Sequence, residues 1–364
     1  MSNSLNNAHT DKGFYMKKIA LFATLIFLAT FMLAGCKTES GEKATAPKRI
    51  SIVATIYPQY DWLKNVLGER ADSVDLKLLV KNGADLHSFQ PSAKDIATIA
   101  KADLVVYVGG ESEEWIEKAL AATPKEGRTE VNLMKALGDR VKEEEIVEGM
   151  QAEEEEHHPE TSSGQAHEHG EEAEEHHHHD EEEEVENDEH IWLSLKNAEI
   201  LVKSIAESLA KIDAANADTY KANAAAYIAK IQELDGEFAT AVSGASQKTV
   251  LFGDRFPFRY LVDDYGIKYY AAFVGCSAES EASFETVTFL AGKMDSLQLP
   301  AILTIEGSDT KIARTVLEAS KNSKGAEILT LNSMQSVTDE QIKAGVSYLS
   351  IMQSNLETLK KALK

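Results

Sequence analysis

The chain has 364 residues, of which 60 are acidic and 37 basic, so its formal net charge at pH 7 is −23. This acidic balance, together with the lack of a basic cluster, excludes recognition of nucleic acid through a positively charged surface. The chain has only two cysteines, which excludes a small fold held together by several disulfides.

The N-terminal residues have the pattern of an export signal. Met16 and two lysines precede an apolar run over 19–33, which is too short for an ordinary membrane-spanning helix. The run ends in Leu-Ala-Gly-Cys, which looks like a bacterial lipobox, so Cys36 is predicted to carry lipid. We therefore expect a signal peptide over 1–36, with Met16 as its true first residue, followed by a polar tether over 37–48. The alternative is a membrane anchor that is never cleaved.

From residue 49 onward, apolar β-branched runs alternate with segments of helical periodicity. This alternation predicts parallel sheets with helices on both faces. We expect an N-terminal lobe over 49–195. Its expected strands are 50–55, 74–80, 103–108 and 129–133, and its expected helices are 57–67, one that begins after Ser92, and one that carries Trp115.

The stretch over 143–189 sets the charge of the whole chain. It holds 22 acidic residues, no lysine or arginine, and eight histidines. A segment this polar cannot bury enough surface to fold alone, so we expect a solvated loop. Because imidazole binds zinc, copper and nickel, the loop is also predicted to collect divalent metal weakly. The candidate weak sites are His157, His158, His167, His169, His176, His177, His178 and His179.

The second half begins with a helical region over 196–247 that includes one long helix near 216–242. The alternative is a helix broken near Gly236. A C-terminal lobe is expected over 248–364. The sequence thus predicts an α/β protein of two lobes, each with a four-stranded, mostly parallel sheet flanked by helices, joined by one long helix. In the second lobe the expected strands are 249–252, 267–274, 301–305 and 328–331, and the expected helices are 260–265, 282–297, 310–320 and 342–363.

Two histidines lie outside both the leader and the acidic loop. His87 follows the second expected strand, and His190 directly follows the loop. Ligands bind outside the carboxyl ends of parallel strands, and a metal site needs two or three converging ligands. His87 and His190 are therefore candidate metal ligands, although either alone would more often be structural.

Four motifs in the chain carry a family resemblance. They are Thr55-Ile56-Tyr57-Pro58-Gln59-Tyr60, Gly83-Ala84-Asp85-Leu86-His87-Ser88-Phe89-Gln90-Pro91, Ala102-Asp103-Leu104 and Glu189-His190-Ile191-Trp192-Leu193. On these motifs the chain resembles the zinc and manganese solute-binding lipoproteins of bacterial ABC transporters, called cluster A-I, over nearly all of 49–364. A His-rich acidic loop before the motif that contains His190 is typical of the zinc-preferring branch. The resemblance implies two lobes joined by one long helix, with metal in the cleft and His87 and His190 as ligands.

The C-terminal lobe departs from the family's pattern. The resemblance implies a third ligand, histidine or glutamate, after the first strand of that lobe, and Arg255 stands where the histidine belongs. Arginine cannot lose its proton to bind metal. Asp254 is the first substitute; the alternatives are an ion pair with a neighbouring arginine or a helix cap. The family's fourth ligand falls at about Asn332, where water is the better candidate.

Three other residues that follow expected strands are weaker candidates. Cys276 would bind zinc as a thiolate, although burial is the commoner explanation for an unpaired cysteine. Glu279 and Glu306 offer carboxylates, and the alternative for both is a solvated loop side chain.

The preferred interpretation is a receptor and not an enzyme. It would capture Zn²⁺ outside the cytoplasmic membrane and deliver it to the permease of an ABC importer, as a monomer anchored through lipid on Cys36. Zinc is preferred to Mn²⁺ because manganese favours oxygen-rich sites. The alternatives are a manganese receptor of the same family, or a surface metal buffer or adhesin. A metallohydrolase is disfavoured, because the chain has no His-Glu-x-x-His motif.

Overall fold

The protein is described by a computed structural model that covers residues 49–151, 186–277 and 281–364. The leader with Cys36, the tether, the eight loop histidines and Glu279 lie outside the described residues. None of the described helices combines the length and the apolar character needed to cross a bilayer.

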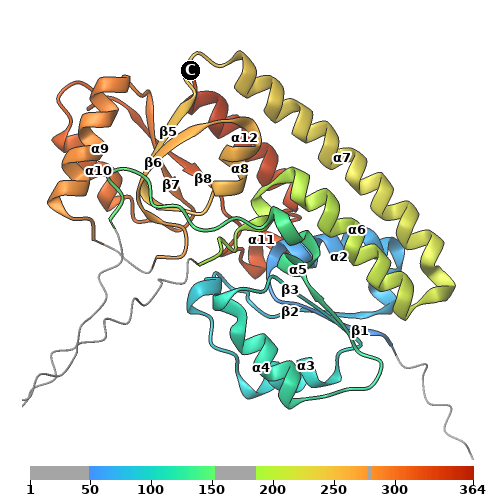
Figure 1. Cartoon of the computed structure of the whole chain (residues 1–364). Helices are drawn as coiled ribbons and strands as arrows, with labels where there is room; N and C mark the ends of the chain where they lie inside the picture. Colours follow the sequence, from blue (N-terminus) through green and yellow to red (C-terminus); the bar gives the residue numbers. More distant parts are fainter. Residues whose placement is uncertain (1–48, 152–185, 278–280) are drawn as a thin grey trace, which may run out of the picture. The chain divides into compact units, whose positions relative to one another are not determined.

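Two separate four-stranded sheets organise the part of the chain from residue 49 (Figure 1). Every strand pairing in them is parallel, which confirms the expected α/β architecture. The strand order is β2-β1-β3-β4 in the first sheet and β6-β5-β7-β8 in the second. The strands are β1 (Ser51–Ala54), β2 (Asp75–Leu78), β3 (Leu104–Tyr107), β4 (Thr129–Asn132), β5 (Thr249–Phe256), β6 (Lys268–Val274), β7 (Ala301–Ile305) and β8 (Glu327–Leu331).

Helices connect the strands and cover both faces of each sheet. The α-helices are α2 (Tyr57–Leu67), α3 (Ala93–Lys101), α4 (Glu114–Ala122), α5 (Leu133–Leu137), α6 (Leu195–Ile212), α7 (Ala217–Gly244), α8 (Arg259–Tyr265), α9 (Phe284–Leu297), α10 (Lys311–Ala319), α11 (Asp339–Lys343) and α12 (Tyr348–Ala362). The short 3₁₀ turns are η1 (Gly68–Ser73), η2 (Leu86–Ser88), η3 (Glu111–Glu113), η4 (Gly138–Arg140), η5 (Ile191–Leu193) and η6 (Ala214–Asn216).

Alternation along the strands divides the core into three clusters. Ile52 and Ala54 on β1 face one cluster, and Val53 between them faces another. On β5, Leu251 faces a third cluster, while Phe252 faces the same cluster as Ile52. Successive residues of a strand point to opposite faces, so each sheet is buried on both sides. The cluster shared by β1 and β5 is continuous between the two lobes.

The long helix is α7, with 28 residues, which at 1.5 Å per residue gives about 42 Å. It continues through Gly236 without a break. Helix α7 packs on α2, α6 and α12 (Figure 1). Its buried positions recur every three or four residues, as the sequence predicts: Tyr220, Ala224, Tyr227, Ile231, Leu234, Phe238 and Val242.

Two expected boundaries are wrong. The expected final helix over 342–363 is two helices, because Gly345 takes a positive φ of 88° that ends α11. Ser347 then caps α12 by accepting a hydrogen bond from the backbone of Ser350. Strand β5 was expected to end at Phe252 but continues to Phe256, past a register shift.

Backbone hydrogen bonds hold both described ends of the acidic stretch in place. Asp188 donates its backbone N–H to the carbonyl of Lys142, and Glu144 donates to Glu186. Gln151 then donates its backbone N–H to Ala272 on β6, an edge strand of the second sheet. Residues 142–151, which we call the strap, therefore run from the N-terminal lobe onto the C-terminal lobe (Figure 1). The expectation of a solvated loop does not hold for these ends.

Candidate metal centre

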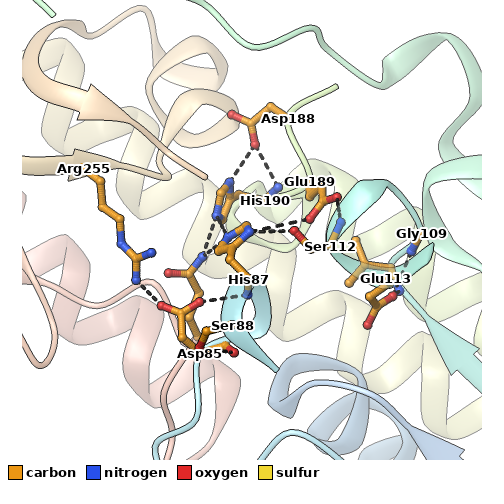
Figure 2. A network of polar contacts seen from close by, with 12 residues as sticks. Asp85, His87, Ser88, Gly109, Ser112, Glu113, Asp188, Glu189, His190 and Arg255 are labelled. Carbon is orange, nitrogen blue, oxygen red and sulfur yellow. Dashed lines mark hydrogen bonds and ion pairs between the residues drawn. The ribbon is translucent and has the colours of Figure 1, made fainter. Parts of the chain in front are cut away.

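Three potential metal ligands converge where the two lobes meet. The ligand atoms of His87, His190 and Cys276 all lie within 4.8 Å of one another, and no other group of three or more His, Cys, Asp or Glu with this closeness occurs among the described residues. The Nε2 atoms of the two histidines are 3.1 Å apart (Figure 2). Two nitrogens bound to one tetrahedral zinc at about 2.0–2.1 Å lie about 3.3 Å apart. The two imidazoles are thus spaced for a shared zinc ion.

His87 is held by the turn that carries it. The carboxylate of Asp85 caps η2 by accepting the backbone N–H of His87 at 3.0 Å. Nδ1 of the His87 ring lies 2.7 Å from Oγ of Ser112, which leaves Nε2 directed at the centre. Burial, reinforced by the neighbouring His190 ring, lowers the pKa of His87 to about 3. The ring is therefore neutral at physiological pH, the state in which imidazole binds metal.

His190 is fully buried and is oriented by Asp188. Oδ1 of Asp188 accepts from the backbone N–H of His190 at 2.8 Å and lies 2.9 Å from its Nδ1. A carboxylate on Nδ1 keeps the ring proton there and leaves Nε2 free as an acceptor. Asp188 lies among many acidic residues, so nothing in the sequence distinguished it as the partner of His190.

Glu189 is the second buried carboxylate of the site, after Asp188, and it lies beside His87. Its Oε1 accepts the backbone N–H of Ser112 at 2.8 Å, and its Oε2 lies 3.9 Å from Nδ1 of His87 (Figure 2). Burial raises the pKa of Glu189. Gly110 permits this approach, because its φ is 86° and a Cβ there would lie 2.4 Å from Oε1 of Glu189.

Beneath Ser112 lies Glu113, which is fully buried. Its Oε2 accepts from the backbone of Val108 at 2.6 Å and of Gly109 at 3.0 Å. These bonds fix the turn between β3 and η3 and hence the position of Ser112. Burial raises the pKa of Glu113 to about 7.

Cys276 reaches the site from the turn after β6. Its neighbour Gly275 packs against His190 so closely that a Cβ on Gly275 would lie 2.9 Å from Cε1 of that ring. Burial raises the pKa of the Cys276 thiol far above its usual range, and the nearby carboxylates of Glu144 and Glu189 raise it further. The thiol is therefore protonated until a metal displaces the proton. Glu144 belongs to the strap and hydrogen-bonds with this thiol.

The other predicted ligands have different surroundings. Asp254 lies on β5, where its carboxylate accepts from the backbone of Arg255 at 2.9 Å and of Ile305 at 3.4 Å. Arg255 forms an ion pair with Asp85 across the two lobes (Figure 2). Neither Asp254 nor Glu306 belongs to the converging group.

Glu306 organises the loop after β8. Its carboxylate accepts from the backbone and hydroxyl of Ser333 at 2.7 and 2.8 Å, and from the backbone of Gln335 at 3.0 Å. The side-chain oxygen of Asn332 accepts from the backbone of Met334 at 2.8 Å, so it caps the same loop.

Gln335 is a site residue that the sequence did not indicate. Its side-chain nitrogen lies 2.9 Å from Nε2 of His87 and 2.6 Å from Nε2 of His190. The only available signal was its position four residues after a parallel strand. A cavity of about 450 Å³ opens beside Gln335, lined from one lobe by Gly83 and Asp85 and from the other by Asp254 and Arg255.

Comparison with known proteins gives a family match over almost the whole described chain. The model of the family described as "Zinc-uptake complex component A periplasmic" matches residues 52–362.

Curated relatives include the zinc-binding lipoprotein AdcA of Streptococcus pneumoniae (strain ATCC BAA-255 / R6). It is 34% identical over 345 residues, covering 95% of this chain and 61% of the relative. The chain therefore spans about three-fifths of the length of that relative. The high-affinity zinc uptake system protein ZnuA of Bacillus subtilis (strain 168) is 29% identical over 341 residues, covering 93% of this chain and 96% of the relative.

Solved structures of similar proteins share the fold. The Zn(II)-bound ZnuA-like domain of Streptococcus pneumoniae AdcA has a TM-score of 0.63 and 29% identity, covering 87% of this chain and 99% of that one. The metal-dependent lipoprotein YcdH of Bacillus subtilis has a TM-score of 0.65 and 26% identity, covering 87% and 100%.

Proposed function

Because the chain belongs to the family of zinc-uptake complex component A proteins, we propose that it is the extracytoplasmic receptor of a zinc importer. It binds Zn²⁺ between its two lobes and passes the ion to the permease of an ABC transporter. The observation that carries the proposal is the pair of imidazole Nε2 atoms 3.1 Å apart, with a thiol in reach. Capture and delivery require no chemical step.

The proposed ligands are His87, His190 and Cys276. Imidazole nitrogen and thiolate sulfur are both common zinc ligands. Asp254 is the weaker candidate for the third ligand, because its carboxylate already accepts two backbone hydrogen bonds away from the imidazoles. Arg255 is engaged with Asp85, which leaves Cys276 as the side chain of the C-terminal lobe best suited to complete the site.

The donor set supports zinc over manganese. Imidazole and thiolate suit zinc, whereas manganese is held mainly by carboxylate, carbonyl and water oxygens. The carboxylates of Asp188, Glu189 and Glu144 surround the site without joining the converging group. They supply the negative field that favours a dication over a monovalent ion.

The remaining parts of the proposal concern the chain outside the described residues. Lipid on Cys36 would hold the receptor to the outer face of the cytoplasmic membrane, with 37–48 as a tether. The eight histidines between 157 and 179 would raise the local concentration of zinc near the site, as any tethered ligand does. Weak binding there and tight binding between the lobes are separate properties.

A competition titration against a zinc chelator tests the ligand set in the chain from residue 37. We expect His87→Ala, His190→Ala and Cys276→Ser each to lower zinc affinity by more than about tenfold, which is ~1.4 kcal/mol. Asp254→Asn is the matched control and should change it little. Unchanged affinity in both histidine variants would overturn the proposed site, and tight Mn²⁺ binding with weak Zn²⁺ binding would reverse the metal.

A further inference from the structure

The two imidazoles of the site face each other with their acceptor nitrogens. Asp188 keeps the proton of His190 on Nδ1, so Nε2 of that ring offers a lone pair. Nε2 of His87 lies 3.1 Å away, and it also offers a lone pair in the tautomer whose Nδ1–H donates to Oγ of Ser112 at 2.7 Å. Two lone pairs at this distance repel each other unless a cation or a hydrogen-bond donor lies beside both. In the metal-free protein, something other than zinc must satisfy them.

Gln335 meets this requirement. Its Nε2 lies 2.6 Å from Nε2 of His190 and 2.9 Å from Nε2 of His87. The primary amide has two N–H groups, so it can donate one to each ring. The reversed amide would press an oxygen against the lone pair of His190, which is unfavourable.

The amide is also held firmly in place. Gln335 is buried, with 5% of its surface exposed. Its backbone N–H and both donors of Ser333 are accepted by Glu306. Ser333 is linked in turn to the core, since its carbonyl accepts from Nε1 of Trp192 at 2.8 Å. The loop after β8 therefore presents the Gln335 side chain to the imidazoles from a rigid base.

We propose that Gln335 is a built-in substitute for the metal, whose amide group bridges the two imidazoles in the metal-free protein and must be displaced from them by Zn²⁺. The inference rests on the proposed zinc-binding function. It makes Gln335 a residue that sets affinity by stabilising the metal-free form. Because His87 belongs to the N-terminal lobe and Gln335 to the C-terminal lobe, the bridge also keeps the lobes together without metal, and it speeds release by competing for the ligands.

The test compares Gln335→Leu with wild type in the chain from residue 37. Gln232→Leu is the matched control, because Gln232 is an exposed glutamine of α7 whose side chain donates to Glu199. Two quantities are measured: the thermal midpoint of the metal-free protein after chelation, and the zinc affinity by chelator competition. Gln335→Ala is a second variant should leucine not fit.

Leucine cannot donate to either ring, so the metal-free midpoint should fall by at least about 3 °C relative to the control. The zinc affinity should rise by about fivefold, because the incoming ion no longer displaces a hydrogen bond. Weaker zinc binding in both variants would overturn the proposal and indicate that Gln335 is itself a ligand. An unchanged metal-free midpoint would overturn it as well. If wild type binds no zinc tightly, the proposed function fails, while the metal-free midpoints still decide whether the bridge exists.

Discussion

Asp188 accepts the backbone N–H of His190 with the same Oδ1 that lies 2.9 Å from the Nδ1 of its ring. One carboxylate oxygen thus holds both the backbone and the ring of a buried histidine, and it sets the tautomer of that ring. We expect Asp188→Ala to lower zinc affinity by about 10–100-fold, the usual cost of removing such a partner from a metal-bound histidine.

The measurement is chelator competition with purified variants. Asp139→Ala is the control, since Asp139 is an exposed acid in η4. Equal affinities in Asp188→Ala and wild type would show that the ring needs no help from this carboxylate.

Glu113 should make stability depend on pH. Burial raises its pKa from 4.5 to about 7 in the folded protein, so the unfolded chain loses this proton first as the pH rises. The stabilising effect of the protonated carboxyl is full below about 4.5 and is lost as the pH rises through 7. Glu113→Gln should remove that loss, which is on the order of 2–3 kcal/mol.

Urea unfolding at pH 5 and pH 8 checks this prediction. The free energy of unfolding of Glu113→Gln, taken relative to that of wild type, should be higher at pH 8 than at pH 5. A difference between variant and wild type that stays constant would mean that Glu113 titrates normally.

Two deletions within the acidic stretch should affect the tight zinc site differently, because only the longer one removes the structured ends of the stretch. Deleting 152–185, with a short flexible linker, should leave the tight zinc site within about threefold of wild type and remove several weak sites. Deleting 143–188 also removes Glu144 and Asp188, which contact Cys276 and His190. We expect the longer deletion to weaken the tight site by more than about tenfold.

Calorimetric titration with Zn²⁺ gives both the stoichiometry and the affinity of the two deletions. Loss of tight binding in the shorter deletion would assign the tight site to the acidic stretch itself.

The interlobe ion pair between Arg255 and Asp85 should affect zinc through charge. Burial acts to raise the pKa of Asp85, but the Arg255 guanidinium outweighs it and the pKa is lowered. Arg255 also brings positive charge toward a cation site. We expect Arg255→Gln to raise zinc affinity by roughly threefold to tenfold, with a smaller gain at high salt.

Arg314→Gln, on the exposed face of α10, is the control. Weaker zinc binding in Arg255→Gln would mean that the ion pair's hold on the two lobes matters more than its charge.

Local signals were enough to predict most of the fold. The bounds of α2 agree with the expected 57–67, because Gly68 ends the helix. The motifs around His87 and His190 likewise pointed to two imidazoles that the structure brings together. Such signals lie within a few residues of the feature they predict.

The rest of the candidate site depends on contacts between distant segments. Asp254 was preferred because it is the carboxylate next to Arg255, in the loop expected after 249–252. Strand β5 instead continues to Phe256 and keeps that carboxylate on backbone amides. Cys276 and Gln335 come from two other loops, and only the packing of the lobes decides which loop reaches the imidazoles. Sequence spacing carries no information on that packing.

Helix α2 lies near the start of the folded chain, but residues near the C-terminus hold it in place. The hydroxyl of Tyr57 donates to the carbonyl of Val346 at 2.5 Å, and the backbone N–H of Tyr348 donates to Asp61 at 3.2 Å. The first lobe therefore cannot complete its core while the last helix is still being synthesised or threaded through a membrane. A product truncated before residue 346 would lose α12 and expose Trp62 of α2, which packs against Tyr348.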